Sequence, residues 1–258
     1  MAEAPPPPPT TLPDVRPVTA SWHRYTAAAP DGREQPTDVA RYGADIATES
    51  TLRLLGAVDG KRVLDLGCGA GHASVTFARH GAKVIAVDPS AHQLDEARQA
   101  AEQADVRIEL QQANLAELAF LRAEGIDVVF SAFALAEAPD LDRVFRQVHR
   151  VLKQEGPLVF SLPHPAFAML DPAAPDPLTI RRRYHDAEPT IWCDGDRRVV
   201  DHPRTISEVF TSLTRANFRV DTLREPGVSE AAARSTHWTD LMAVVPATVI
   251  FRARKHGF

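Results

Sequence analysis

The sequence predicts an α/β fold in which a doubly wound, mostly parallel sheet is covered by helices on both faces. Short, continuously apolar runs such as "KVIAVD" (83–88) alternate with helical patterns, of which 141–152 is the clearest. Continuous apolar runs are typical of parallel strands buried on both faces. The glycines of "GCGAG" (67–71) directly follow the first such run, which indicates a strand end where the backbone closely approaches a ligand.

The elements follow one another as strand and helix along the chain. We expect five strands at 61–67, 83–88, 106–114, 126–133 and 157–163, and helices at 71–80, 90–104 and 141–152. A further helix opens at Thr205, where Thr205 and Glu208 have the spacing of a capping box, as do Ser90 and Gln93. Segments 219–226 and 247–255 are expected to be two closing strands, paired like a hairpin.

Composition changes along the chain suggest a division into segments. We expect a disordered proline-rich tail at 1–20, an N-terminal helical cap at 21–60, a ligand-binding core at 61–165, a lid inserted at 166–203, and a helix with closing strands of the same domain at 204–258. Five consecutive prolines favour an extended, solvated tail. The lid is rich in proline and aspartate, and its scattered aromatic residues favour packing over a free linker.

Bulk properties exclude several classes of protein. The 258 residues carry a net charge of −5, so a nucleic-acid partner is not expected, and "RRR" (181–183) reads as a solvated face. No run of about 18 apolar residues is present, so no membrane association is expected. The absence of a signal pattern and the two distant cysteines, Cys68 and Cys193, predict a cytoplasmic protein. Cys68 is expected to fill space in the glycine loop.

The spacing of the loop glycines distinguishes two ligands. A dinucleotide fingerprint places its third glycine three residues after the second, but His72 stands there and the glycines read G-x-G-x-G. Asp65 precedes the loop and could hold an ammonium group, which a pyrophosphate lacks. Asp88 ends the second strand, where a carboxylate can accept both hydroxyls of a ribose, and Asn114 could bind an adenine edge. These features fit S-adenosylmethionine.

In these motifs the chain resembles the class I S-adenosylmethionine-dependent methyltransferases. "VLDLGCGAGHAS" is similar to the first motif of that family, "VIAVDPS" to its ribose-binding strand end and "QQANLAEL" to its adenine-side segment. "SLPHPAF" and "HPRT" resemble motifs of a small bacterial, methyltransferase type 11/25-like subgroup, with Pro203 as an extra residue in the second. The resemblance implies a Rossmann-like methyltransferase fold, with a seven-stranded sheet, a reversed final strand and a lid after strand 5.

The resemblance also implies roles for individual residues. Asp65, Gly67 and Gly69 would hold the methionine portion, Asp88 the ribose, and Asn114 and Leu115 the adenine, with Ser131 facing the reacting methyl group through its backbone. Cys68 and Pro89 belong to the same loops, and Tyr42 could reach the carboxylate end of the cofactor. The full predicted cofactor set is Tyr42, Asp65, Gly67, Cys68, Gly69, Asp88, Pro89, Asn114, Leu115 and Ser131.

The implied reaction is an in-line transfer of methyl to an oxygen, nitrogen or carbon nucleophile of a small molecule. His164, His202 and Tyr184 are the candidate bases, and no spacing of acidic residues predicts a metal site. Two alternatives stay open: a non-catalytic S-adenosylmethionine-binding or partner-binding protein, and an NAD-dependent oxidoreductase. The oligomeric state is not predicted.

Overall fold

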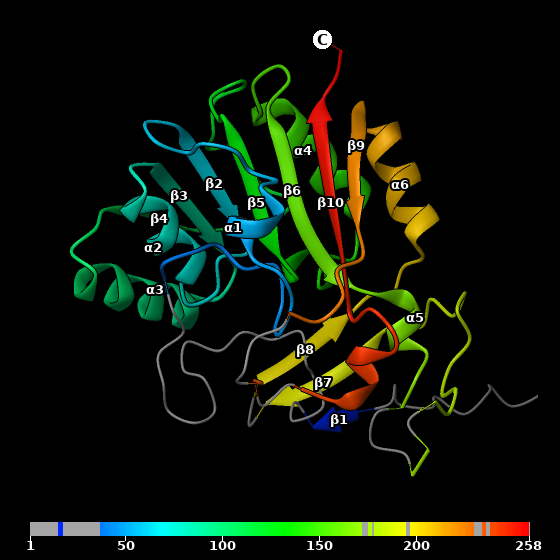
Figure 1. Cartoon of the computed structure of the whole chain (residues 1–258). Helices are drawn as coiled ribbons and strands as arrows, with labels where there is room; N and C mark the ends of the chain where they lie inside the picture. Colours follow the sequence, from blue (N-terminus) through cyan, green and yellow to red (C-terminus); the bar gives the residue numbers. More distant parts are fainter. Residues whose placement is uncertain are drawn as a thin grey trace, which may run out of the picture.

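A computed structural model describes residues 15–17, 37–171, 175–176, 178–194, 197–229, 234–235 and 238–257. Two sheets organise this part of the chain, a large one with the strand order β4-β3-β2-β5-β6-β10-β9 and a small one with the order β1-β7-β8. The small sheet lies beyond the carboxyl ends of the parallel strands of the large sheet (Figure 1). The region between the two sheets is therefore where a ligand of the large sheet is expected.

The large sheet has seven strands, as predicted. They are β2 (Arg62–Leu66), β3 (Lys83–Asp88), β4 (Ile108–Gln112), β5 (Val128–Ala132), β6 (Pro157–Pro163), β9 (Phe218–Arg224) and β10 (Thr248–Lys255). The first five are parallel, and β10 runs antiparallel to both β6 and β9. The strand order reverses between β2 and β5, so the loops after these two strands flank a switch point.

Helices cover both faces of this sheet. On one face, α4 (Leu141–Val151) and α6 (Ile206–Arg215) bury aliphatic residues and Phe145 against β5, β6 and β10. On the other, α2 (His72–Arg79) and the 40–58 segment bury Tyr42 and Phe77 against Phe130. The thirteen-residue α3 (Ala91–Gln103) lies against β4 and buries Leu94, Ala97 and Ala101. The doubly wound arrangement is thus confirmed.

The small sheet is built mainly from the region predicted to be a lid. After β6, the short α5 (Pro165–Ala168) leads through a bridge between Leu170 and Ile180 to the antiparallel pair β7 (Thr190–Asp194) and β8 (Arg197–Asp201). Its third strand is β1 (Val15–Pro17), which pairs in parallel with β7. These three residues fall inside the tail for which disorder was predicted; the rest of 1–20 lies outside the described residues.

Several boundaries differ from the sequence predictions. Within 37–60, the described part of the predicted helical cap, α1 (Glu49–Leu52) is the one α-helix, and the rest is irregular. Strand β4 ends at Gln112 rather than Asn114, because Asn114 begins a turn in which its side chain accepts from the Ala116 N–H at 3.0 Å. The capping box of α6 is complete. That of α3 is only half formed, because the Gln93 side chain donates to Glu96.

Candidate active site

The glycine loop is held against the end of β3 by backbone hydrogen bonds. The N–H groups of Gly67 and Cys68 both donate to the carbonyl of Val87, at 2.7 and 3.0 Å. Gly67 has φ +78°, and a Cβ at this position would lie 2.0 Å from the Cβ of Ala134. Only glycine therefore permits this approach between the loop and the segment after β5.

Asp88, at the end of β3, ties this loop to the loop that follows β3. Its carboxylate is 7% exposed and accepts from the Gly69 N–H through Oδ2 and from the Ser90 N–H through Oδ1, both at 2.9 Å. A carboxylate has about four acceptor positions, so these two bonds leave one on each oxygen. Asp88 can therefore still accept two hydroxyl groups, as the predicted ribose contact requires.

Asp65 is a buried carboxylate beneath the same loop. It is 1% exposed, and its Oδ2 accepts from the Ser74 hydroxyl of α2 at 2.5 Å. Burial raises the pKa of Asp65 to about 7, the negative charge of Asp88 adds to this rise, and the Ser74 hydrogen bond opposes it. Two carboxylates beneath one loop make the site suited to a ligand with a positive charge.

The other predicted contacts of the cofactor lie around this loop. Leu115 is buried, and its side chain reaches to 3.8 Å from a Cβ built at Gly67. Asn114 and Pro89 are exposed, and the Pro89 carbonyl accepts from the side chain of Gln112 at 3.1 Å. The loops after β2, β3 and β4 are thus brought together at one edge of the sheet.

Ser131 lies inside β5, where the predicted role was a backbone contact. Its side chain is fully buried, and its hydroxyl has no hydrogen-bond partner in the described part of the chain. The strand ends one residue later, and the chain leaves the sheet at Phe133, which adopts φ +60°. The 3₁₀ helix Ala134–Ala136 follows directly and packs its first residue against Gly67.

Two predicted cofactor residues have structural contacts of their own. Tyr42 is fully buried and donates its hydroxyl to Glu49 Oε2 at 2.5 Å, and Glu49 also accepts from the N–H groups of Leu54 and Leu55. A contact between Tyr42 and the cofactor would require this hydroxyl to leave Glu49, so it stays a prediction. The pKa of the Cys68 thiol is raised, mainly by burial, as expected for a space-filling cysteine.

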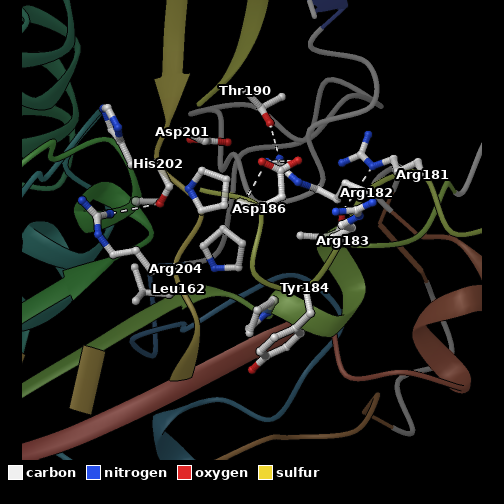
Figure 2. A pocket seen from close by; sticks show the side chains of 15 residues that line it. Leu162, Arg181, Arg182, Arg183, Tyr184, Asp186, Thr190, Asp201, His202 and Arg204 are labelled. Atoms are coloured by element: carbon white, nitrogen blue, oxygen red, sulfur yellow. Dashed lines mark hydrogen bonds and ion pairs between the residues drawn. The ribbon is translucent and has the colours of Figure 1, made fainter. Parts of the chain in front are cut away.

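A pocket lies between the carboxyl end of β6 and the lid, and we call it the lid pocket. Its lining contains Ala136, Leu162, Pro163, Pro165, Ala168, Arg181, Arg182, Arg183, Tyr184, Asp186, Thr190, Asp201, His202, Pro203 and Arg204. Figure 2 shows the three consecutive arginines on one side of it and His202 with Arg204 on the other. The 3₁₀ helix Ala134–Ala136 separates the glycine loop from the lid pocket, because Ala134 faces Gly67 while Ala136 lines the pocket.

The candidate bases differ in their surroundings. His164 is 5% exposed and caps α5: its Nδ1 accepts from the Ala166 N–H at 3.2 Å, which places its proton on Nε2, 2.8 Å from Glu225 Oε1. Both ring nitrogens of His164 are therefore engaged within the protein. His202 and Tyr184 instead line the lid pocket. The pKa of His202 is lowered, first by burial and then by the charge of Arg204.

Sequence reasoning missed several residues of this region. Arg181, Arg182 and Arg183, read as a solvated face, line the lid pocket together with Asp201. His202 and Arg204 line the same pocket despite the extra Pro203 between them. No group of acidic, histidine or cysteine side chains in the described ranges is arranged to hold a metal ion. Among the described helices, none has the length and apolar character needed to span a membrane.

Comparison with known proteins agrees with this geometry. Residues 63–156 match the family described as a methyltransferase domain. The ubiquinone biosynthesis O-methyltransferase of Hahella chejuensis is 38% identical over 105 residues, which cover 41% of this chain and 44% of that protein. The chain thus spans less than half the length of this curated relative.

Solved structures extend the likeness to most of the chain. The S-adenosylmethionine-dependent methyltransferase of Mesorhizobium loti is 28% identical with a TM-score of 0.60, over 78% of this chain and 94% of that one. A Listeria monocytogenes protein, 24% identical, shares the fold with a TM-score of 0.64 over 80% of this chain and 95% of that one.

A seven-stranded sheet with antiparallel closing strands and a glycine loop beside a buried aspartate define the class, a Rossmann-like methyltransferase fold. Residues 63–156 form a methyltransferase domain, and over most of its length the chain is similar to an S-adenosylmethionine-dependent methyltransferase of class I. The methyl donor of this class is S-adenosylmethionine. The residues present fit it, because the buried carboxylates of Asp88 and Asp65 offer acceptors to its ribose and its ammonium group.

Proposed function

We propose that this protein transfers a methyl group from S-adenosylmethionine to a small molecule bound in the lid pocket. The observation that carries the proposal is the position of Ala134–Ala136, which has the glycine loop on one side and the lid pocket on the other. A donor at the loop and an acceptor in the pocket would therefore meet beside the end of β5. Holding two reactants in such proximity accounts for much of the catalysis in a displacement reaction.

When bound, S-adenosylmethionine supplies a methyl group already activated by a sulfonium centre. The chain itself would orient the ribose through Asp88 and the ammonium group through Asp65, whose pKa of about 7 would fall beside a positive charge. The lid would exclude water from the acceptor.

An oxygen or protonated nitrogen acceptor must also lose a proton. Among the three candidates, His202 is best placed as the base, because it lines the lid pocket and its lowered pKa keeps the ring neutral at pH 7. Tyr184 lines the same pocket as a second candidate. His164 would first have to release Glu225 or the Ala166 N–H, so we propose a structural role for it.

Calorimetric titration with S-adenosylmethionine, S-adenosylhomocysteine and NAD tests the donor site. We expect both adenosyl compounds to bind and NAD not to bind. Asp88→Ala removes the proposed ribose acceptor and the partner of two backbone N–H groups, so affinity should fall by about a hundredfold or more, as for a lost charged hydrogen-bond acceptor. Asp95→Ala, an exposed aspartate on α3, is the matched control and should bind normally.

Catalysis is tested separately from binding. Purified protein is incubated with S-adenosylmethionine carrying a labelled methyl group and a panel of small hydroxyl, amine and acid compounds, and label transfer is followed by mass spectrometry. Binding of the donor with no transfer to any acceptor, and no turnover in cell extract, would instead support the non-catalytic binding protein. Binding of NAD alone would overturn the proposal.

A further inference from the structure

The charge of the lid pocket is unusual for a protein with a net charge of −5. Among the described residues, its lining carries more positive than negative side chains: Arg181, Arg182, Arg183 and Arg204 against Asp186 and Asp201. An acidic protein that gathers arginines around one pocket has a local surplus of positive charge there, and this surplus favours an anion.

Of these cations, Arg204 gives the strongest indication of an anion site. It lies between β8 and α6, is half buried, and donates to the carbonyl oxygens of His202, at 3.0 Å, and Ala138. It makes no ion pair in the described part of the chain: Glu208 is engaged in the capping box of α6, and Glu208 and Asp140 act on Arg204 only at longer range. A half-buried guanidinium with neutral partners only can still bind a carboxylate or a phosphate.

Arginines on the opposite side of the pocket add to this surplus of positive charge. Arg182 donates to Thr190 Oγ1 and to the Glu188 carbonyl, both at 2.7 Å, and lies 3.4 Å from Asp186 Oδ2, yet its buried Nε has no hydrogen-bond partner. Arg183 is exposed and makes no ion pair within the described ranges. Arg182 is therefore balanced by a carboxylate, while Arg183 adds an unbalanced charge.

The floor of the lid pocket is apolar. Leu162 and Pro163 end β6, Ala136 comes from the 3₁₀ helix beside the glycine loop, and Tyr184 also lines the pocket. A ligand that fills the pocket would place an apolar body on these residues and a charged group among the arginines.

We propose that the methyl acceptor is a small organic anion, a carboxylate or a phosphate monoester, whose anionic group binds between Arg204 and the Arg181–Arg183 side while its apolar body lies on Leu162 and Tyr184. This inference rests on the proposed function, because it assigns the acceptor to the lid pocket. Arginine binds both anionic groups through paired hydrogen bonds, so the two sources share one chemistry.

Binding of simple probes tests the inference without requiring turnover. Benzoate, phenyl phosphate and their neutral analogue benzamide are titrated into the wild-type protein, with and without S-adenosylhomocysteine, and followed by ligand-observed NMR. We expect at least one anion to bind about tenfold or more tightly than benzamide, with an affinity that falls as salt rises. Benzoate and phenyl phosphate distinguish the two sources. Equal affinity for benzamide and both anions would overturn the inference.

Matched variants locate the site. Arg204→Gln and Arg183→Gln should each weaken binding of the preferred anion by about tenfold and leave the affinity for benzamide unchanged, since a charge-assisted bond is lost. Arg146→Gln, an exposed arginine of α4 outside the pocket, should have no effect. If Arg204→Gln does not fold, the anion affinity of Arg183→Gln, a change at an exposed position, tests the inference instead. Unchanged anion affinity in both pocket variants would overturn the inference.

The outcomes also separate this inference from the proposed function. Anion binding at the arginines without any binding of S-adenosylmethionine would contradict the methyltransferase proposal and leave the anion site standing. If the protein binds and uses S-adenosylmethionine but does not prefer anions, the methyltransferase proposal would stand and the anion site would be contradicted.

Discussion

The proposed donor site at the glycine loop and the proposed acceptor site in the lid pocket differ in the groups that form them. The glycine loop is fixed by backbone hydrogen bonds to Val87 and by the buried carboxylates of Asp65 and Asp88, which lie on the neighbouring strands β2 and β3. The lid pocket is lined by side chains of β6, α5, the irregular chain from 181 to 186 and residues 201–204, and four of them are arginines. A site made of backbone tolerates few changes, whereas a site made of long side chains can vary with the acceptor.

The largest effect is expected at Gly67, on the donor side. Gly67→Ala would place a Cβ 2.0 Å from that of Ala134 at φ +78°, so the loop must move. We expect binding of S-adenosylmethionine to be lost and the melting temperature to fall by several degrees, measured by calorimetry and circular dichroism. Gly56→Ala is the matched control: its φ is +71° but nothing lies within 4 Å, so it should cost only about 1 kcal/mol of stability. Equal effects of the two variants would contradict the backbone account of the site.

Histidine variants come next and probe the acceptor side. His202→Gln should lower kcat by about a hundredfold with an acceptor that must lose a proton, and should remove the acidic limb of the pH–rate profile. The affinity for S-adenosylmethionine should not change.

His164→Asn provides the contrast. Asparagine can keep the N-cap of α5 but not the bond to Glu225, so the free energy of unfolding should fall by about 1 kcal/mol while the pH–rate profile keeps its shape. If His164→Asn changes the profile and His202→Gln does not, the assignment of the two histidines is reversed.

A pH-dependent effect on stability is expected at Asp65. Its pKa of about 7 lies above the ordinary 3.8, so the folded protein holds a proton that the unfolded chain releases between these values. The contribution of Asp65 to the free energy of unfolding is therefore largest below about pH 4. It falls by up to about 4 kcal/mol as the pH rises to 7. Asp65→Asn should remove this slope in urea unfolding and weaken binding of S-adenosylmethionine.

The control for Asp65 is Asp221, a carboxylate whose pKa is shifted in the opposite direction. Asp221 binds Arg252 and Arg254 at 2.7 and 2.8 Å, and these arginines hold its pKa below the usual value. Its contribution to stability is present above its ordinary pKa and is lost as pH falls. Asp221→Asn should therefore destabilise the protein at neutral pH, the opposite of Asp65→Asn. A variant of Asp65 that keeps the full pH slope would contradict the predicted titration.

The smallest effect is expected at Cys68. The thiol sits in the loop with a raised pKa and bonds weakly to the carbonyl of its neighbour Gly69, at 3.5 Å. Cys68→Ala should change the affinity for S-adenosylmethionine by no more than a few-fold in calorimetry, and the thiol should react slowly with iodoacetamide in a Cys193→Ser background. Rapid alkylation would show that the thiol is not a space-filling group.

The strands, helices and glycine loop around the proposed donor site could be predicted from the sequence because their signals are local. Glycines follow an apolar strand, Asp88 ends the next one, and Ser90, two residues later, caps α3. The acceptor side depends on contacts between distant segments, which no local pattern reveals. Glu225, 61 residues from His164, occupies its Nε2, and the consecutive arginines face a pocket only because β8 and α5 fold around them.

The 3₁₀ helix Ala134–Ala136 has a consequence for how the two ligands influence each other. One of its residues touches the glycine loop, another lines the lid pocket, and the carbonyl of Ala136 accepts from the His202 N–H at 2.8 Å. A shift of this single turn would move residues of both sites, so we expect a ligand that shifts it from one side to change the affinity on the other. Thermodynamic linkage makes that influence equal in both directions, and the order in which the ligands arrive leaves the final free energy unchanged.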